Sequence, residues 1–148
     1  MEKKNILVSA CLLGTPCRYD GASKPNAKVI ALSEKYNLIP VCPEVAGGLP
    51  TPRTPSEIVG ERVLMRDGCD VTENYKCGAE IALDVARKNA CTVAILKARS
   101  PSCGKGQVYD GTFSGTLTSG DGITAKLLSD AGITVLTEEN MCKLLTIL

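Results

Sequence analysis

The stretch that decides the fold is Asn5-Ile6-Leu7-Val8-Ser9-Ala10-Cys11, near the start of the chain. Its apolar run is short, rich in β-branched residues and free of glycine and proline, which predicts a buried strand over Asn5–Ala10. A run that is apolar at every position is typical of a strand covered on both faces, as in a parallel sheet. The first residue after this strand, Cys11, is then expected at the edge of the sheet.

Further along the chain, short apolar runs alternate with longer stretches of helical periodicity. The expected strands are Leu38–Val41, Gly60–Met65, Thr92–Leu96 and Ile133–Leu136. The expected helices are Asn26–Tyr36, Thr72–Asn89 with Thr72 as N-cap, Gly122–Ala131 closed by Gly132, and a terminal helix from Thr137 to about Ile147. This alternation predicts one compact α/β domain over residues 1–148, a Rossmann-like three-layer fold with a mainly parallel sheet.

Two segments carry no such pattern and are expected to be long functional loops. Residues 43–58 hold four prolines, and residues 97–120 are rich in Gly, Ser and Thr. Loops longer than about 12–15 residues in a compact domain are usually functional or disordered, and neither segment is of low complexity.

Composition limits the chemistry. The 148 residues include no histidine and no tryptophan, and the net charge is only +1. Without histidine, Ser-His and Cys-His nucleophile pairs are excluded, so acid–base work falls to other groups. The small charge and the few aromatic residues argue against a DNA partner. The short apolar runs predict no membrane partner and a cytoplasmic location.

Eight cysteines are present, and no two of them form a Cys-x-x-Cys pair. Cys11, Cys42 and Cys103 each follow a predicted strand, and ligands of open parallel sheets bind beyond the carboxyl ends of the strands. Three thiols converging there would suit an iron–sulfur cluster or zinc. The alternative is that each is a buried core thiol, and the spacing alone leaves both readings open.

The other cysteines give weaker signals. Core packing is the favoured role of Cys77, Cys91 and Cys142, and Cys69 is expected to be structural in a turn flanked by glycine. Cys17 shares a loop with Cys11, and as a fourth ligand it would close a metal site that three ligands leave open.

Polar residues in the same loops complete the candidate site. Glu44, two residues after Cys42, is a candidate proton acceptor, and Ser100 and Ser102 are candidates for orienting a substrate or water. The cationic side chains in these loops, any of which could bind a phosphate or carboxylate, are Arg18, Arg53, Lys97 and Arg99. The glycines around Asp121 could expose amides to an anion at a helix start.

At this point the chain resembles a known family, DUF523, which includes the thiouracil desulfidases of the TudS type. The resemblance covers nearly the whole chain and is carried by motifs in a fixed order: Val8-Ser9-Ala10-Cys11-Leu12-Leu13-Gly14, Arg18-Tyr19-Asp20-Gly21, Val41-Cys42-Pro43-Glu44-Val45, Gly47-Gly48-Leu49-Pro50-Thr51-Pro52-Arg53, Lys97-Ala98-Arg99-Ser100-Pro101-Ser102-Cys103-Gly104 and Tyr109-Asp110-Gly111-Thr112-Phe113.

The resemblance implies a [4Fe–4S] cluster held by Cys11, Cys42 and Cys103, with Glu44 and Ser100 as catalytic residues. Cys17 lies where the family's pattern does not require cysteine. The implied reaction is non-redox hydrolysis of a thiolated pyrimidine, thiouracil or a thiouridine nucleotide, with release of sulfide. A tRNA substrate is less expected, because the additional domain that some relatives link to RNA is not found here. The alternatives are a metal or iron–sulfur binding module without catalysis, and an iron–sulfur hydratase that uses arginines to clamp a hydroxy acid.

Overall fold

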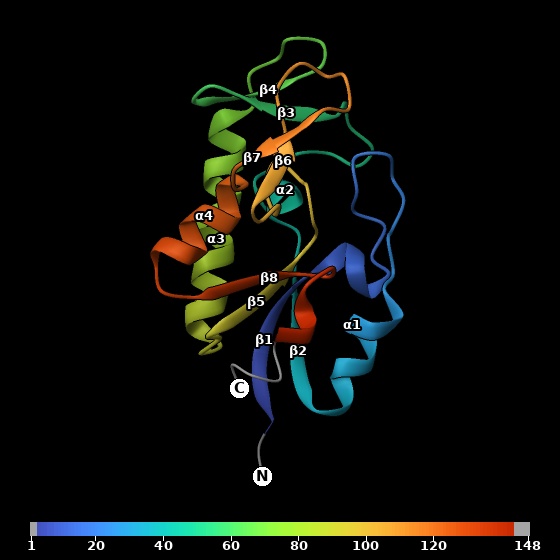
Figure 1. Cartoon of the computed structure of the whole chain (residues 1–148), viewed down its shortest axis with the longest axis vertical. Coiled ribbons are helices and arrows are strands. Elements are labelled where there is room, and N and C mark those ends of the chain that lie inside the picture. Colours follow the sequence, from blue (N-terminus) through green and yellow to red (C-terminus); the bar gives the residue numbers. More distant parts are fainter. Residues whose placement is uncertain (1–2, 144–148) are drawn as a thin grey trace.

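A four-stranded parallel sheet forms the centre of the computed structural model, which describes residues 3–143. The strand order is β2-β1-β5-β8, with bounds β1 Lys4–Ser9, β2 Tyr36–Val41, β5 Val93–Leu96 and β8 Thr134–Thr137. Every neighbouring pair is parallel, so all four carboxyl ends lie at one edge of the sheet (Figure 1). The predicted α/β fold with a mainly parallel sheet is confirmed.

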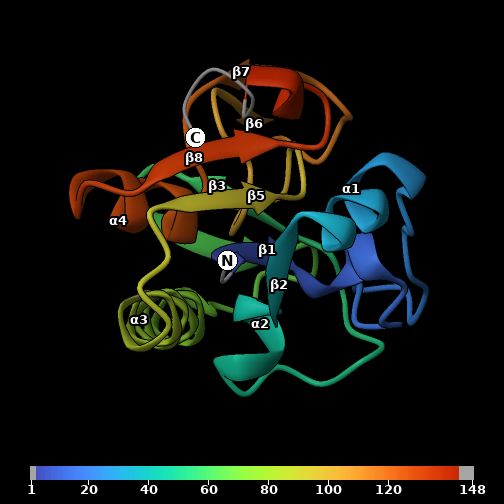
Figure 2. The same ribbon diagram turned by 90° about the horizontal axis from the view of Figure 1, so that it is seen from below.

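Helices cover both faces of this sheet, as Figure 2 shows. Helix α3 (Thr72–Lys88) and helix α4 (Ile123–Asp130) pack on one face, where Leu7 lies in the same apolar cluster as Ala82 and Ala86. The short helix α1 (Ala27–Ala31) packs on the other face through Val29. Neighbouring residues of β1 are therefore buried on opposite sides, which explains why its apolar run is continuous.

Two small antiparallel hairpins lie beyond the carboxyl edge of the sheet. One pairs β3 (Ser56–Val59) with β4 (Arg62–Met65), and the other pairs β6 (Gln107–Tyr109) with β7 (Leu117–Ser119). The expectation that residues 43–58 and 97–120 are simple loops is therefore wrong, because they contain helix α2 (Pro43–Ala46) and strands β3, β6 and β7. Strand β7 is exposed at all three positions, so it has no apolar alternation to reveal it.

Element boundaries differ from the sequence prediction where sheet pairing competes with helix formation. The helix expected over Asn26–Tyr36 ends early, in a 3-10 turn over Leu32–Glu34, because Tyr36 already pairs with Lys4 in the sheet. The prediction of Thr72 as N-cap is wrong: Val71 is the N-cap and Thr72 is the first residue of α3, whose amide donates to the carboxylate of Asp70 at 2.9 Å.

The C-terminal helix that the sequence predicts falls largely outside the described residues. Within them, the chain forms a 3-10 turn over Met141–Lys143. Gly132 follows α4 with φ of 91°, as expected of a glycine that ends a helix.

Two of the three cysteines assigned to core packing do not pack there. Cys91 is buried, but Cys77 and Cys142 are exposed, and Cys69 is exposed as well. Cys77 lies on the exposed face of α3, so its place in the helix did not indicate burial. Over residues 3–143, no helix is long and apolar enough to span a bilayer.

Candidate active site

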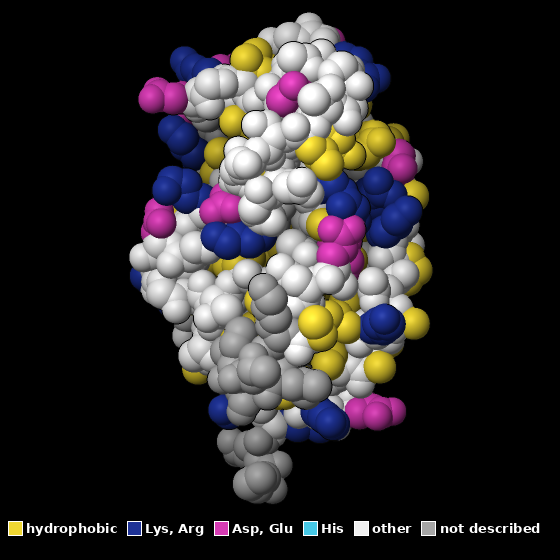
Figure 3. All heavy atoms as spheres, viewed as in Figure 1, with side chains coloured by type: hydrophobic (Ala, Val, Ile, Leu, Met, Phe, Trp, Pro, Cys, Tyr) yellow, Lys and Arg dark blue, Asp and Glu magenta, His cyan; other side chains and the backbone are white. Residues whose placement is uncertain are grey.

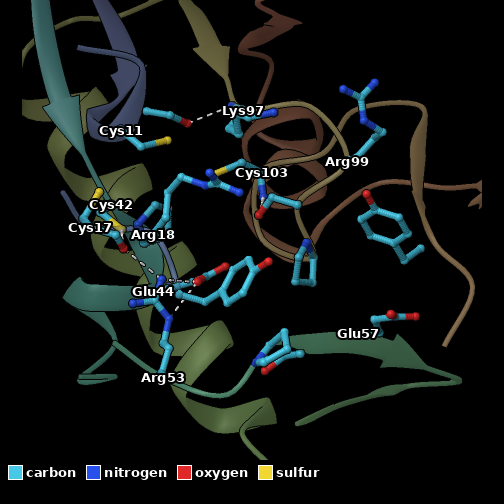
Figure 4. Close-up of a pocket in the computed structure, with 18 of the residues that line it drawn as sticks. Cys11, Cys17, Arg18, Cys42, Glu44, Arg53, Glu57, Lys97, Arg99 and Cys103 are labelled. Atoms are coloured by element: carbon cyan, nitrogen blue, oxygen red, sulfur yellow. Dashed lines mark hydrogen bonds and ion pairs between the residues drawn. The ribbon is translucent and has the colours of Figure 1, made fainter. Parts of the chain in front are cut away.

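The loops that leave β1, β2 and β5 surround a cavity of about 610 Å³. Cys11 follows β1 in a 3-10 turn, Cys42 directly follows β2, and Cys103 lies seven residues beyond the end of β5. All three thiols line this cavity, and Cys17 lines it too (Figure 4). The parallel sheet thus brings together three cysteines that are far apart in the sequence, as the strand positions predict.

Cys17 forms a compact group with two of the predicted ligands. Its thiol lies within hydrogen-bonding reach of the thiols of Cys11 and Cys42, and the Cys42 thiol also donates to the Cys17 carbonyl oxygen at 3.7 Å. Interaction with Cys11 raises the pKa of Cys17, and interaction with Cys17 raises that of Cys42. The raised pKa values favour the neutral thiol forms of Cys17 and Cys42.

Cys103 stands on the other side of the group, on a loop attached to the start of α4. The amides of Gly122, Ile123 and Thr124 donate to carbonyl oxygens of residues 101, 102 and 104. The amides at this helix start are thus occupied by the protein itself, and the anion site expected near Asp121 is not formed. Burial raises the pKa of the Cys103 thiol to about 12.

Ser100 lines the cavity and also shapes the Cys103 loop. Its Oγ accepts hydrogen bonds from the amides of Ser102 at 3.1 Å and Cys103 at 3.2 Å. Since Oγ is the acceptor in both, its own hydrogen is available to a substrate or water. Ser102 is buried away from the cavity and bonds the Thr124 hydroxyl at 2.7 Å, so it has a structural role.

Glu44 reaches the cavity from the first turn of α2, with its side chain 14% exposed. Its Oε2 accepts from Arg53 Nε at 3.0 Å and from Nη2 of the same guanidinium (Figure 4). Arg53 was a candidate clamp for a substrate carboxylate or phosphate, but the structure pairs it with Glu44 instead.

A close contact between α2 and α3 sets the position of Glu44 and Cys42. A Cβ at Gly78 would overlap the Pro43 carbonyl oxygen, and one at Gly47 would overlap the carbonyl oxygen of Asn74. The Asn74 side-chain amide also donates to the Gly47 carbonyl at 2.9 Å. Only glycine at both positions allows the two helices to approach this closely.

Most of the cationic side chains around the cavity have acidic partners. Lys97 pairs with Glu138 at 2.8 Å, and Arg99 pairs with Glu139 at 2.8 Å. Arg18 lies 3.8 Å from the carboxylate of Asp20, a weaker contact. The remaining cavity-lining cations, Lys24 and Arg66, have no acidic partner within the described part of the chain.

The cavity has two chemically different ends. The thiol end consists of Cys11, Cys17, Cys42 and Cys103, next to the central sheet. The hairpin end is formed by residues from the two small hairpins and their loops, namely Glu57, Arg66, Tyr109 and Phe113. Figure 4 shows Glu57 on the opposite side of the cavity from the labelled cysteines.

The hairpin end is held in shape by a buried acid. Oε1 of Glu57 accepts hydrogen bonds from the amides of Gly111 at 2.9 Å and Phe113 at 3.2 Å. Phe113 has φ of 57°, a conformation that non-glycine residues seldom adopt, and its ring lies 5.9 Å from the Arg66 guanidinium.

The donor set suits an iron–sulfur cluster better than a single ion. Among the described residues, no three Cys, Asp or Glu side chains meet closely enough to hold one metal ion. A cubane cluster does not require the thiolates to meet at one point, because each thiolate binds its own iron atom.

Comparison with known proteins now identifies the family. Residues 6–140 match the family described as 2-thiouracil desulfurase. The chain belongs to this family. A curated relative, the uncharacterized protein YbbK of Bacillus subtilis (strain 168), is 41% identical over 146 residues, covering 92% of this chain and 97% of that protein.

A solved structure extends this likeness to the whole fold. The [4Fe–4S]-dependent thiouracil desulfidase TudS has 46% sequence identity and a TM-score of 0.93, with 98% of this chain and 97% of that chain covered. The chain is thus a full-length homologue of a desulfidase, and the membership of the family expected from its motifs is confirmed.

Sequence reasoning missed three features of the site. It did not anticipate the Arg53–Glu44 pair, although both residues lie in one recognised motif region nine residues apart. It gave Tyr75 no role, whereas Tyr75 lines the cavity. It also gave Glu57 no role, because nothing in the sequence indicates that the 110–113 loop folds back onto β3.

Proposed function

We propose that the chain is a [4Fe–4S]-dependent desulfidase that removes sulfur from a thiolated pyrimidine by hydrolysis. The observation that carries the proposal is the convergence of Cys11, Cys42 and Cys103 on one cavity that also contains Glu44 and Ser100. Full-length homology to a [4Fe–4S]-dependent thiouracil desulfidase supports both the cofactor and the reaction.

The three cysteines would hold the cluster as thiolates. When bound in this way, the cluster supplies an iron atom without a protein ligand, a soft Lewis acid suited to a thiocarbonyl sulfur. The cavity walls then keep the pyrimidine ring against this position and limit the entry of bulk water.

Glu44 and Ser100 would carry the proton transfers. Glu44, with Oε2 held by Arg53, is placed to accept a proton from a water molecule that attacks the thiocarbonyl carbon. The free hydroxyl hydrogen of Ser100 can orient that water or the ring. The carbon–sulfur bond breaks, oxygen from water takes the place of sulfur, and hydrogen sulfide leaves. No electrons are gained or lost in the sum.

The charge of the cavity favours a nucleotide over a free base. Arg53, Lys97 and Arg99 are paired with carboxylates, which leaves Lys24 and Arg66 to attract an anion, with Arg18 only weakly engaged. A phosphate attached to the thiolated pyrimidine through its ribose could pair with a cation of this set, such as Arg66 at the hairpin end. On the face seen in Figure 3, basic and acidic side chains are interspersed, which suits a small ligand better than a nucleic acid.

The hydratase alternative loses its main support, since two arginines of the expected carboxylate clamp, Arg53 and Arg99, are already paired with Glu44 and Glu139. A closed, non-catalytic centre is favoured by one observation, the contact of Cys17 with Cys11 and Cys42. A closed centre would bind iron without releasing sulfide from any substrate.

One experiment separates these functions. The protein is purified and reconstituted without oxygen, and its iron and sulfide contents are counted. It is then incubated with thiouracil, 4-thiouridine monophosphate, a thiolated tRNA and hydroxy acids. We expect sulfide release from the nucleotide in preference to the base. A protein that carries a cluster and releases no sulfide from any of these substrates would overturn the proposal.

A further inference from the structure

The guanidinium of Arg53 is buried and fully occupied by the protein. Its side chain is only 3% exposed. Besides its two contacts with Glu44 Oε2, it donates from Nη2 to the Cys17 carbonyl at 3.0 Å. From Nη1 it donates to the Pro50 carbonyl and the Thr51 hydroxyl, each at 3.1 Å. An arginine satisfied in this way cannot bind substrate through its own donors.

Tyr75 approaches the same carboxylate from helix α3. The residue is 2% exposed, yet it lines the same cavity as Glu44, and its hydroxyl lies close to the side chains of Glu44 and Ser56. A buried tyrosine hydroxyl normally has a hydrogen-bond partner, and the Glu44 carboxylate is an acceptor that lies close to it. Burial and the nearby negative charge of Glu44 raise the pKa of Tyr75, so the hydroxyl keeps its proton and can donate it.

We propose that Arg53 and Tyr75 form a clamp that fixes the Glu44 carboxylate in the orientation from which it takes a proton. Both are positioning residues, because they act through Glu44 and do not touch the reacting atoms. This inference rests on the proposed function, in which Glu44 is the proton acceptor.

The geometry explains what each part of the clamp contributes. Both Arg53 donors that reach Glu44 use the same oxygen, Oε2, so Arg53 leaves Oε1 unoccupied. A glutamate has three side-chain torsions, and without restraint its carboxylate would sample several positions. A misplacement of roughly 1 Å at a reacting group can lower the rate about 100-fold.

Arg53 also joins this carboxylate to the thiol end of the cavity. The Cys17 carbonyl that accepts from Arg53 is the one that accepts from the Cys42 thiol. One side chain therefore fixes the distance between the proton acceptor and the loop that carries Cys17. Lysine at position 53 could keep the charge but could not supply donors to Glu44, Cys17 and Pro50 together.

The test uses Arg53→Lys and Tyr75→Phe in the reconstituted protein. We expect kcat to fall about 100-fold in Arg53→Lys and about 10-fold in Tyr75→Phe, with KM, iron content and visible absorbance unchanged. Because both residues act through Glu44, neither change should lower the residual rate further in a Glu44→Gln background. Matched controls are Arg62→Lys on exposed β4 and Tyr36→Phe at the start of β2.

A crystal structure of each metal-free variant adds a readout independent of turnover, and we expect the Glu44 carboxylate to leave its wild-type position in Arg53→Lys. Wild-type kcat in both variants, or losses that multiply with that of Glu44→Gln, would overturn the clamp. Absence of sulfide release from the wild-type protein would instead remove the proposed function, so the two failures are distinguishable.

Discussion

The two ends of the cavity are built by different kinds of structure. The thiol end lies at the carboxyl ends of β1, β2 and β5, of which β1 and β5 are buried on both faces. The hairpin end is made of short strands beyond the sheet, and its two hairpins are joined by the hydrogen bonds that Glu57 accepts from the Gly111 and Phe113 amides. The difference suggests that the sheet fixes the chemistry and the hairpins adapt to the substrate, a division that mutations at each end can test.

Loss of a ligand at the thiol end should have the largest effect. Cys103→Ala removes one of the three proposed thiolates, so we expect the visible absorbance of the cluster and the desulfidase activity to fall to background. Cys77→Ala, at an exposed thiol on α3, is the matched control and should keep both. A Cys103→Ala protein with full iron content would show that the ligand set is different.

Removal of the proton acceptor should lower activity and leave cofactor binding unchanged. In Glu44→Gln we expect unchanged absorbance and iron content but a kcat lower by about 10²–10⁴-fold, the range that general acid–base catalysis contributes. Glu61→Gln, in the exposed turn between β3 and β4, serves as the control. Full activity in Glu44→Gln would assign the proton transfer to another group.

A change at the hairpin end should alter substrate preference and leave the chemistry intact. Arg66→Gln removes an unpaired cation, so we expect KM for a thiouridine nucleotide to rise about 10-fold, with kcat and the KM for free thiouracil unchanged. Arg62→Gln removes an exposed arginine of the same hairpin, which pairs with Asp70, and should change neither constant. Equal effects of Arg66→Gln on nucleotide and base would contradict a phosphate contact.

The buried acid of the hairpin end should affect stability more than turnover. Glu57→Gln weakens the acceptor of the Gly111 and Phe113 amides, and we expect a loss of about 1 kcal/mol in the free energy of unfolding. Urea denaturation of the metal-free protein measures it. A stability equal to that of the wild type would mean that the loop is held by other contacts.

Cys17→Ser should have the smallest effect at the thiol end. We expect iron content and kcat close to the wild-type values, because three other thiols supply the proposed ligands. If Cys17 is instead a fourth ligand, both the visible absorbance and the iron content of Cys17→Ser would fall. That result would favour a closed centre with four protein ligands over an open one with three.

Sequence periodicity predicted the parts of the fold whose residues are buried, and missed those that are exposed. β1 and β5 could be predicted from their continuous apolar runs. β7 could not, because it has no buried residue and therefore no apolar pattern. The convergence of Cys11, Cys42 and Cys103 followed from strand positions alone, because parallel strands share one carboxyl edge.

Contacts that side chains make across turns could not be predicted from sequence periodicity. Nothing in the order of residues shows that Arg53 folds back to Glu44, or that the amides before α4 are used by the Cys103 loop. The roles of Glu44 and Ser100 came from resemblance to the family, and the structure adds the contacts through which they can be tested.

The glycine contact between α2 and α3 has a consequence for protein engineering. An alanine at position 78 or 47 would be an innocuous change in most helices, but here it would force the short helix outwards together with Cys42 and Glu44. Mutant libraries meant to widen the range of accepted thio-compounds should therefore leave these two positions unvaried and diversify the opposite wall. Random screens, conversely, should recover inactive clones at both glycines, although neither carries any reactive atom.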